Sequence, residues 1–236
     1  MKKNILLLWI IILCVWVSWW TTLFLMSKYY SVTVKHNSLV EISPTILAST
    51  VSITGTLDDK GITTTRSGTG IIVRDDGLIL TNKHLISEWF TYSIQLHDAT
   101  TFSAKVLKVH PALDLALLVI ISDQPLRLSV GDFINSQSHV SPWQGVIAIG
   151  NTLGIYPWSI SEGIVAGLNR SVSFNGNIMD WLIQTSIPMT LGNSGGPLIN
   201  PEGKIIGINI GIVGWSSQIG WTLPLTQEMI ETFLKS

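Results

Sequence analysis

Short segments rich in β-branched residues recur along most of this 236-residue chain, and glycine or Asp/Asn turns separate them. In the clearest example, residues 68–73 and 78–81 flank the turn sequence Asp75-Asp76-Gly77. The Asp-Gly pair supplies the left-handed backbone conformations that a hairpin turn needs. Many short strands at this spacing predict an all-β fold, either a sandwich or a pair of barrels.

The predicted strands form two series, with a boundary near residues 135–142. The first series covers residues 49–55, 68–73, 78–81, 92–96, 101–109 and 116–121, and the second covers 145–149, 159–168, 181–185, 197–199, 204–210 and 219–223. Beyond the N-terminal segment, a helix is predicted only at residues 226–235. There Thr226 can cap the first turn and an apolar stripe follows it.

Residues 5–26 carry no charge and are strongly apolar. As a helix this segment would be about 33 Å long, enough to cross a hydrocarbon core of about 30 Å. Lys2 and Lys3 precede it and Lys28 follows it, so the distribution of positive charge predicts a cytoplasmic N-terminus. We therefore predict a single-pass membrane protein whose remaining chain is extracytoplasmic, either periplasmic or extracellular.

A cleaved signal peptide is the alternative interpretation of residues 5–26. Such a peptide has an apolar core of about 7–15 residues followed by a small-x-small cleavage site. The observed segment is longer, and no Ala-x-Ala pattern follows it. Cys14, the only cysteine, lies inside this segment, so the predicted external domain contains no disulfide.

Composition excludes several classes of function. The net charge is −1 and basic residues form no stripe or run, which argues against a nucleic-acid partner. The five histidines are scattered and no cysteine–histidine cluster offers a metal site. We predict neither a metal nor a cofactor.

The segment Gly192-Asn193-Ser194-Gly195-Gly196-Pro197 has the composition of a nucleophilic site. A serine hydroxyl attacks only when a base removes its proton and when donors stabilise the resulting oxyanion. The glycines allow the backbone to turn sharply and to direct N–H groups into one small cavity. Taken alone, however, Asn-Ser-Gly-Gly is also the composition of an ordinary turn.

Three segments together resemble the trypsin-like serine peptidases, and in particular the HtrA branch (the DegS and DegP type). SGTGIIVRDDGLILTNKHLI is similar to the histidine segment of that branch, HPALDLALLVI to its aspartate segment, and IQTSIPMTLGNSGGPLIN to its serine segment. They occur in the order of chymotrypsin, which differs from the order in subtilisin and in the α/β-hydrolases.

The resemblance implies a chymotrypsin-like double β-barrel, to which the residue patterns above add a C-terminal helix and one N-terminal transmembrane helix. We expect a cytoplasmic tip and anchor at residues 1–30, a tether at 31–43 and a peptidase domain at 44–236. Within that domain the first barrel would span about 44–135, the second about 140–225, and the helix 226–235.

The resemblance places the general base at His84, the orienting carboxylate at Asp114 and the nucleophile at Ser194. A histidine suits the role of base because it exchanges a proton near neutral pH. Asp114 precedes an apolar run, and a carboxylate at the mouth of a buried strand needs a hydrogen-bonding partner. Asp98 is the competing carboxylate, although its surroundings are those of a hairpin turn.

The backbone amides of Gly192 and Ser194 would form the oxyanion hole, with Asn193 shaping the turn between them. The resemblance assigns the primary specificity pocket to Pro188 and Met189, and Ile208 and Ile210 would line its other wall. These positions include no acidic residue, so we expect a small or medium apolar side chain before the scissile bond rather than lysine or arginine. Two departures from the family pattern are Leu191, where proline is common, and His110, where aspartate is usual.

We therefore expect a serine endopeptidase that cleaves misfolded or signalling polypeptides at the outer face of a membrane through an acyl-enzyme. The alternatives are a catalytically silent pseudo-peptidase that binds unfolded chains and a purely structural membrane protein. The HtrA resemblance also suggests a homotrimer. HtrA-type proteins usually carry a PDZ domain after the peptidase, and we expect none in this chain.

Overall fold

The computed structural model describes residues 43–174, 176–211 and 219–235. The predicted anchor at residues 5–26 and the predicted tether, apart from its last residue, lie outside these ranges. In the described part of the chain, no helix is both long enough and apolar enough to cross a membrane.

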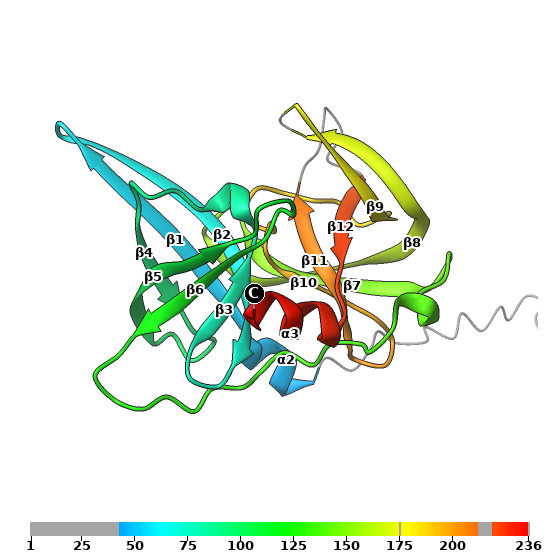
Figure 1. Ribbon diagram of the computed structural model, residues 1–236, viewed down its shortest axis with the longest axis horizontal. Coiled ribbons are helices and arrows are strands. Elements are labelled where there is room, and N and C mark those ends of the chain that lie inside the picture. The colour runs from blue at the N-terminus through cyan, green and yellow to red at the C-terminus, as the bar shows by residue number, and fades with distance from the viewer. Residues whose placement is uncertain (1–42, 175, 212–218, 236) are drawn as a thin grey trace, which may run out of the picture. The chain divides into compact units, whose positions relative to one another are not determined.

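Six antiparallel strands close the first barrel (Figure 1). They are β1 (Thr50–Asp59), β2 (Ile62–Arg74), β3 (Leu78–Thr81), β4 (Thr91–Gln95), β5 (Thr101–Val109) and β6 (Ala116–Ile121), in the spatial order β1-β2-β3-β6-β5-β4. The Asp75-Asp76-Gly77 turn joins β2 to β3 as predicted, and Gly77 has a φ of 95°.

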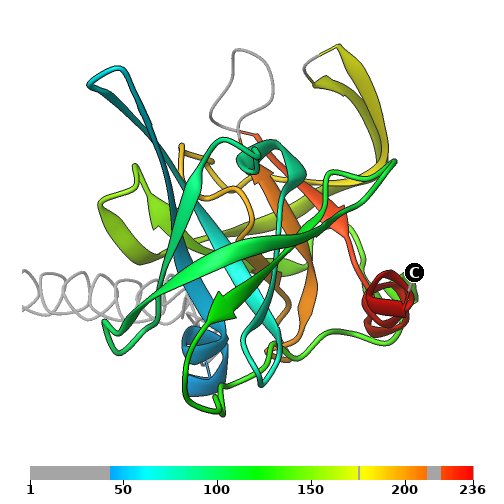
Figure 2. The ribbon, with the colours of Figure 1, turned by 60° about the vertical axis from the view of Figure 1, so that its left-hand side comes forward.

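A second group of six strands closes the second barrel. They are β7 (Gly145–Thr152), β8 (Tyr156–Phe174), β9 (Asn177–Thr185), β10 (Pro197–Ile199), β11 (Ile205–Gly211) and β12 (Gly220–Pro224), in the spatial order β10-β11-β12-β9-β8-β7. The predicted all-β double barrel is thus confirmed. The β1–β2 and β8–β9 hairpins are longer than predicted and project beyond the barrels (Figure 2).

Three apolar clusters form the core of the described residues. One fills the first barrel around Ile79 and Leu118, and one fills the second around Val146 and Leu198. The third lies between the barrels and takes Leu78 and Leu80 from β3, with Ile147 and Ile149 from β7 among its members. Because alternate side chains of β3 and β7 face different clusters, both faces of these strands are buried. This explains why their sequences are continuously apolar rather than alternating.

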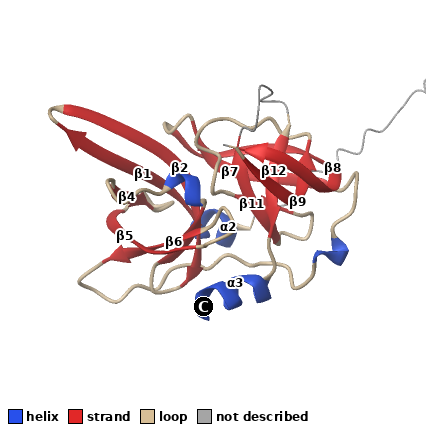
Figure 3. Ribbon diagram, turned by 45° about the horizontal axis from the view of Figure 1, so that its top comes forward, coloured by secondary structure: helices blue, strands red, loops and turns tan. Residues whose placement is uncertain are grey.

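Two α-helices, α2 and α3, flank the strands in the described part of the chain (Figure 3). The predicted C-terminal helix is confirmed as α3 (Gln227–Lys235), which buries Ile230 and Phe233 in the cluster between the barrels. The prediction that residues 49–55 open the first strand was wrong at its start. Residues Pro44–Ser49 form a helix, α2, that Ser43 caps by accepting a hydrogen bond from the Thr45 amide.

Candidate active site

The strands that line the interface between the barrels carry the three predicted catalytic residues at their ends. His84 lies in η1 (Lys83–Leu85), a single 3₁₀ turn that follows β3, and Asp114 lies just before β6. Ser194 lies in the turn that precedes β10. Because β3 pairs with β6 up to Thr81 and Ala116, the ends of these strands hold His84 and Asp114 together.

His84 and Asp114 form a closely bonded pair. The ring Nδ1 of His84 lies 2.7 Å from Oδ2 of Asp114, and the backbone amide of His84 donates to Oδ1 at 2.9 Å. Both carboxylate oxygens are thus engaged by one residue, which fixes the ring and assigns the Nδ1 proton to the side that faces Asp114. The side chains are 22% and 11% exposed, so water competes little for this pair.

Asn82 reinforces the pair, a role that was not predicted from the sequence. Its side chain is fully buried, and Nδ2 donates to the carbonyl oxygen of Asp114 at 3.1 Å. Among the described residues, its Oδ1 has no hydrogen-bond partner. A buried polar side chain that leaves one atom unsatisfied is costly, so its retention calls for a compensating role. The only signal in the sequence was the position of an asparagine two residues before His84.

The competing carboxylate, Asp98, lies in an exposed turn between β4 and β5. Its Oδ1 accepts a hydrogen bond from the Thr100 amide at 2.9 Å, and this bond lowers the pKa of its carboxyl group. The turn interpretation of Asp98 agrees with this geometry.

Ser194 is 8% exposed, and its hydroxyl points to the main chain of β11. Oγ donates a 2.8 Å hydrogen bond to the carbonyl oxygen of Ile210. The neighbouring Gly211 leaves room for the hydroxyl, because a Cβ on Gly211 would lie 2.3 Å from Oγ. In this conformation the hydroxyl is directed to Ile210 rather than to His84.

The glycines beside Ser194 are required by close backbone contacts. Gly192 has a φ of 95°, and a Cβ on it would lie 1.8 Å from the Asn151 carbonyl oxygen. Gly195 has a φ of 86°, and its Cβ would lie 2.0 Å from the Thr69 carbonyl oxygen and 2.5 Å from Thr81 Oγ1. No larger residue fits either position. The turn is thereby packed against the middle of β2, at Thr69, and against the end of β3, the strand that leads to His84.

Hydrogen bonds to the main chain of the turn then fix its conformation. Thr69 donates its amide to the Ser194 carbonyl at 2.8 Å and its hydroxyl to the Gly192 carbonyl at 2.7 Å. The Asn193 amide donates to the Thr190 carbonyl. Within the described residues, the amides of Gly192 and Ser194 donate no such bond and stay available for an acceptor.

The sequence comparison agrees with this arrangement. A family model described as "Trypsin-like peptidase domain" matches residues 68–208, more than half of the chain. The chain belongs to the trypsin-like peptidase family. The expectation of a serine endopeptidase domain is confirmed at the level of this family.

The chain has curated relatives among the DegP-like serine endoproteases. It is 38% identical over 162 residues to a probable periplasmic serine endoprotease DegP-like of Rickettsia conorii, an alignment that covers 66% of this chain and 31% of that protein. It is 36% identical over 166 residues to the magnetosome formation protease MamE of Paramagnetospirillum magneticum, covering 68% and 22% respectively. The chain thus spans a third or less of the length of these relatives.

A solved structure supports the fold. The HtrA-type protease AlgW with decapeptide matches with a TM-score of 0.65 and 24% sequence identity, covering 80% of this chain and 64% of that one. At this identity the match bears on the fold of the peptidase and not on its substrates.

The residues assigned to the specificity pocket have different surroundings. Pro188 is exposed, whereas Met189 is buried in the core of the second barrel. Ile208 and Ile210 are buried in the cluster between the barrels. The terminal carbon of Met189 approaches β12, since a Cβ on Gly220 would lie 2.9 Å from it. The pocket itself stays a prediction.

No metal centre accompanies the candidate site in the part of the chain that the structure describes. Across residues 43–174, 176–211 and 219–235, no three His, Cys, Asp or Glu side chains gather closely enough to hold an ion.

Proposed function

We propose that this chain is a serine endopeptidase in which His84, Asp114 and Ser194 act as base, orienting carboxylate and nucleophile. The observation that carries the proposal is the engagement of both Asp114 oxygens by His84, at 2.7 and 2.9 Å. This pairing holds Nδ1 as the donor to Asp114, so Nε2 is the nitrogen that can accept a proton. Packing of the Gly195 turn against Thr81 supports the approach of Ser194 to that nitrogen.

In the proposed reaction, the Ser194 hydroxyl leaves the Ile210 carbonyl and transfers its proton to His84 Nε2. Breaking one hydrogen bond of this kind costs about 1 kcal/mol, which a bound substrate readily offsets. Oγ bonds to the scissile carbonyl carbon, and the carbonyl oxygen becomes an oxyanion held by the amides of Gly192 and Ser194.

The tetrahedral intermediate then collapses. The carbon–nitrogen bond breaks and the departing amine takes the proton from His84, which leaves an acyl group on Ser194. Water then hydrolyses the acyl-enzyme. His84 removes a proton from the water as its oxygen bonds to the acyl carbon, the ester bond to Ser194 Oγ breaks, and His84 returns the proton to Oγ. Asp114 keeps its charge throughout and stabilises the imidazolium that forms at each step.

For specificity, we propose a small or medium apolar side chain before the scissile bond. The supporting observation is the absence of acidic residues from 186–191 and 205–211, the segments that hold Met189 and Ile210. A buried lysine or arginine of the substrate would find no opposite charge there, and an unpaired buried charge is costly.

For location, we propose that residues 5–26 anchor the protein with the peptidase domain on the extracytoplasmic side. The relative named as a probable periplasmic endoprotease supports an extracytoplasmic domain. The substrates would be misfolded or signalling polypeptides near the membrane, and the assembly would be a homotrimer.

Fluorophosphonate labelling tests the catalytic proposal directly. These reagents react only with an activated serine, so the wild-type chain should be labelled and Ser194→Ala should not. Ser173→Ala, at an exposed serine of β8, is the matched control and should label like the wild type. The reaction should be run with and without added unfolded protein, because substrate can move the Ser194 hydroxyl from Ile210 to His84.

A catalytically silent binding module is the second candidate. The bond from Ser194 to Ile210 favours it, because this bond directs the hydroxyl away from the base. Absence of labelling in every condition, combined with saturable binding of unfolded protein, would establish this alternative and overturn the first proposal.

A further inference from the structure

The loop that joins β5 to β6 ends on Asp114 and is organised around the ring of His110. His110 Nδ1 accepts hydrogen bonds from two backbone amides, that of Ala112 at 3.1 Å and that of Leu113 at 2.8 Å. The His110 amide donates to the Leu115 carbonyl at 2.9 Å, which closes the loop around Asp114. One side chain therefore determines the path of the backbone immediately before the orienting carboxylate.

This arrangement requires a neutral His110. An imidazole nitrogen that accepts hydrogen bonds carries no proton, so the proton lies on Nε2. Protonation would place a hydrogen on Nδ1, facing two N–H donors. Both bonds would be lost at once, and with them the two side-chain bonds that set the path of the backbone from His110 to Leu113.

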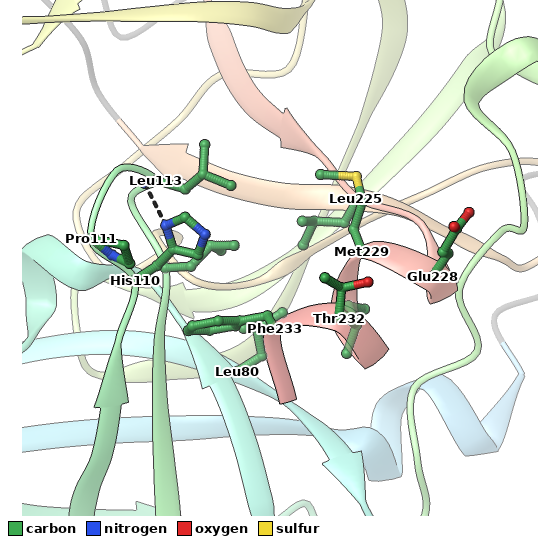
Figure 4. A pocket seen from close by; sticks show the side chains of 11 residues that line it. Leu80, His110, Pro111, Leu113, Leu225, Glu228, Met229, Thr232 and Phe233 are labelled. Atoms are coloured by element: carbon green, nitrogen blue, oxygen red, sulfur yellow. Dashed lines mark hydrogen bonds between the residues drawn. The ribbon is translucent and has the colours of Figure 1, made fainter. Parts of the chain in front are cut away.

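The surroundings of His110 favour the neutral form as well. Its ring packs against Phe233 of α3, with ring centroids 5.1 Å apart, at the edge of an apolar hollow between the loop and that helix (Figure 4). Burial lowers the pKa of His110, and the positive charges of Lys83 from η1 and Lys108 from β5 lower it further. Glu228 of α3, which lines the same hollow, is the acidic group on this side.

A second contact links the loop to the active site. Lys83, the residue before His84, donates from Nζ to the His110 carbonyl at 3.3 Å. Asn82 holds the Asp114 carbonyl at the other end of the loop. The segment 110–114 is thus bonded at both ends to the two residues that precede His84, and His110 sets the geometry between these bonds.

We propose that His110 is a positioning residue for the His84–Asp114 pair, and that the peptidase needs His110 as well as His84 in the neutral form. The inference rests on the proposed function. In this proposal His110 does not contact the substrate. It acts through the backbone that carries Asp114. The proposal also implies that acid inactivates the enzyme through two histidines rather than one.

The pH dependence of kcat/KM tests this inference. If two imidazoles must be neutral, the acid limb of log kcat/KM against pH approaches a slope of about two, against about one for a single base. His110→Asn keeps an acceptor near the position of Nδ1, but asparagine does not titrate. This variant should therefore keep most of the wild-type activity at neutral pH, and its acid limb should have a slope of about one. His139→Asn, at an exposed histidine, is the matched control and should keep the wild-type slope.

A second variant separates positioning from folding. His110→Phe keeps an aromatic ring against Phe233 but removes the acceptor. We expect kcat to fall about 10- to 100-fold with little change in KM, the usual effect of a small misplacement of a catalytic group. An acid limb of His110→Asn that coincides with that of the wild type would overturn the inference, as would full activity of His110→Phe.

A measurement that does not depend on activity keeps the inference separate from the proposed function. In the full chain carrying Ser194→Ala, NMR should show the amide signals of Ala112 and Leu113 shifting with the titration of His110. The ring signals of His84 should differ between His110→Phe and its parent. Unchanged amide and His84 signals would overturn the positioning role even in an inactive protein, whereas absence of fluorophosphonate labelling alone contradicts only the proposed function.

Discussion

At the scale of single residues, the candidate site depends on side chains that fix the main chain rather than on the three catalytic groups alone. Asn82 holds the Asp114 carbonyl, Thr69 holds the Gly192 and Ser194 carbonyls, and His110 holds two amides of its own loop. All of these bonds except the exposed one from the Ala112 amide to His110 are buried or partly buried, where a lost partner leaves an unsatisfied polar group. Substitutions at these positions should therefore affect geometry before they affect folding.

The first prediction concerns Asn82. Asn82→Asp keeps the size of the side chain but replaces the donor that faces the Asp114 carbonyl with a charged acceptor. We expect kcat/KM to fall about 10- to 100-fold through misplacement of Asp114. Asn82→Ala should lose about 1–3 kcal/mol of unfolding free energy because the Asp114 carbonyl loses its partner. Denaturant unfolding and peptide kinetics measure both effects, and Asn135→Ala, at an exposed asparagine, serves as the control.

The second prediction concerns the dependence of folding stability on pH that His110 causes. Because the folded-state pKa of His110 lies below its unfolded value, the unfolded chain binds a proton first as the pH falls. The contribution of His110 to stability is complete above the unfolded pKa and decreases as the pH falls toward the folded pKa. Urea midpoints should therefore drop less between pH 7 and pH 5 (about the range in which histidine titrates) for His110→Asn than for the wild type. Equal drops in the two proteins would contradict this.

At the scale of elements, the site is a product of strand ends. β3 ends at Thr81, where its ladder with β6 stops, and the 3₁₀ turn η1 then presents His84 to Asp114. The turn before β10 fits against the middle of β2 and the end of β3 only because its glycines have no side chain. The position of the nucleophile is thus set by backbone packing between two barrels, and small changes in this turn should have large effects.

The third prediction compares two glycines with similar backbone angles. Gly195 and Gly203 have φ values of 86° and 75°, but a Cβ on Gly203 meets nothing within 4 Å. Gly203→Ala should cost only the strain of the left-handed conformation, about 1–2 kcal/mol. Gly195→Ala must also displace the Thr69 carbonyl, so it should destabilise the protein more and abolish fluorophosphonate labelling. Thermal unfolding and labelling of the two variants side by side check this, and equal effects would show that the turn has room to relax.

At the scale of the whole molecule, one apolar cluster joins the two barrels and α3. Leu80 and Leu115 from the first barrel, Ile149 and Leu223 from the second, and Phe233 from the helix all belong to it. The candidate catalytic residues lie at the edge of this shared core, so neither barrel alone can form the proposed site. Cleavage specificity, membrane association and assembly are properties at this scale.

The fourth prediction is the cleavage profile. In a peptide library, the position before the scissile bond should be dominated by small or medium apolar residues, because residues 186–191 and 205–211 offer no acidic group to a basic side chain. Residues after the bond are read out in the same experiment. A profile rich in lysine or arginine at that position would contradict the proposed pocket around Met189 and Ile210.

The fifth prediction concerns membrane association and assembly. The full chain should stay with the membrane during alkaline carbonate extraction, since an uncleaved apolar segment of this length is not released by loss of electrostatic contacts. For assembly, light scattering of the detergent-solubilised protein should give the molar mass of a homotrimer. Release into the carbonate supernatant would argue for a cleaved signal peptide instead, and a monomeric mass would remove the trimer from the proposal.

The sequence by itself determined the fold class, most strand positions and the three segments that contain the candidate catalytic residues. These are local properties: strand periodicity, turn composition and short motifs depend on neighbours in the chain. Only the tertiary structure decided that Asn82 holds Asp114, that the Ser194 hydroxyl rests on Ile210 and that His110 organises the loop before Asp114. α2 was missed because six residues are too few to show a helical period. The directions of these side chains depend on closure of both barrels around a common core, which brings distant segments within hydrogen-bonding distance and which no local pattern encodes.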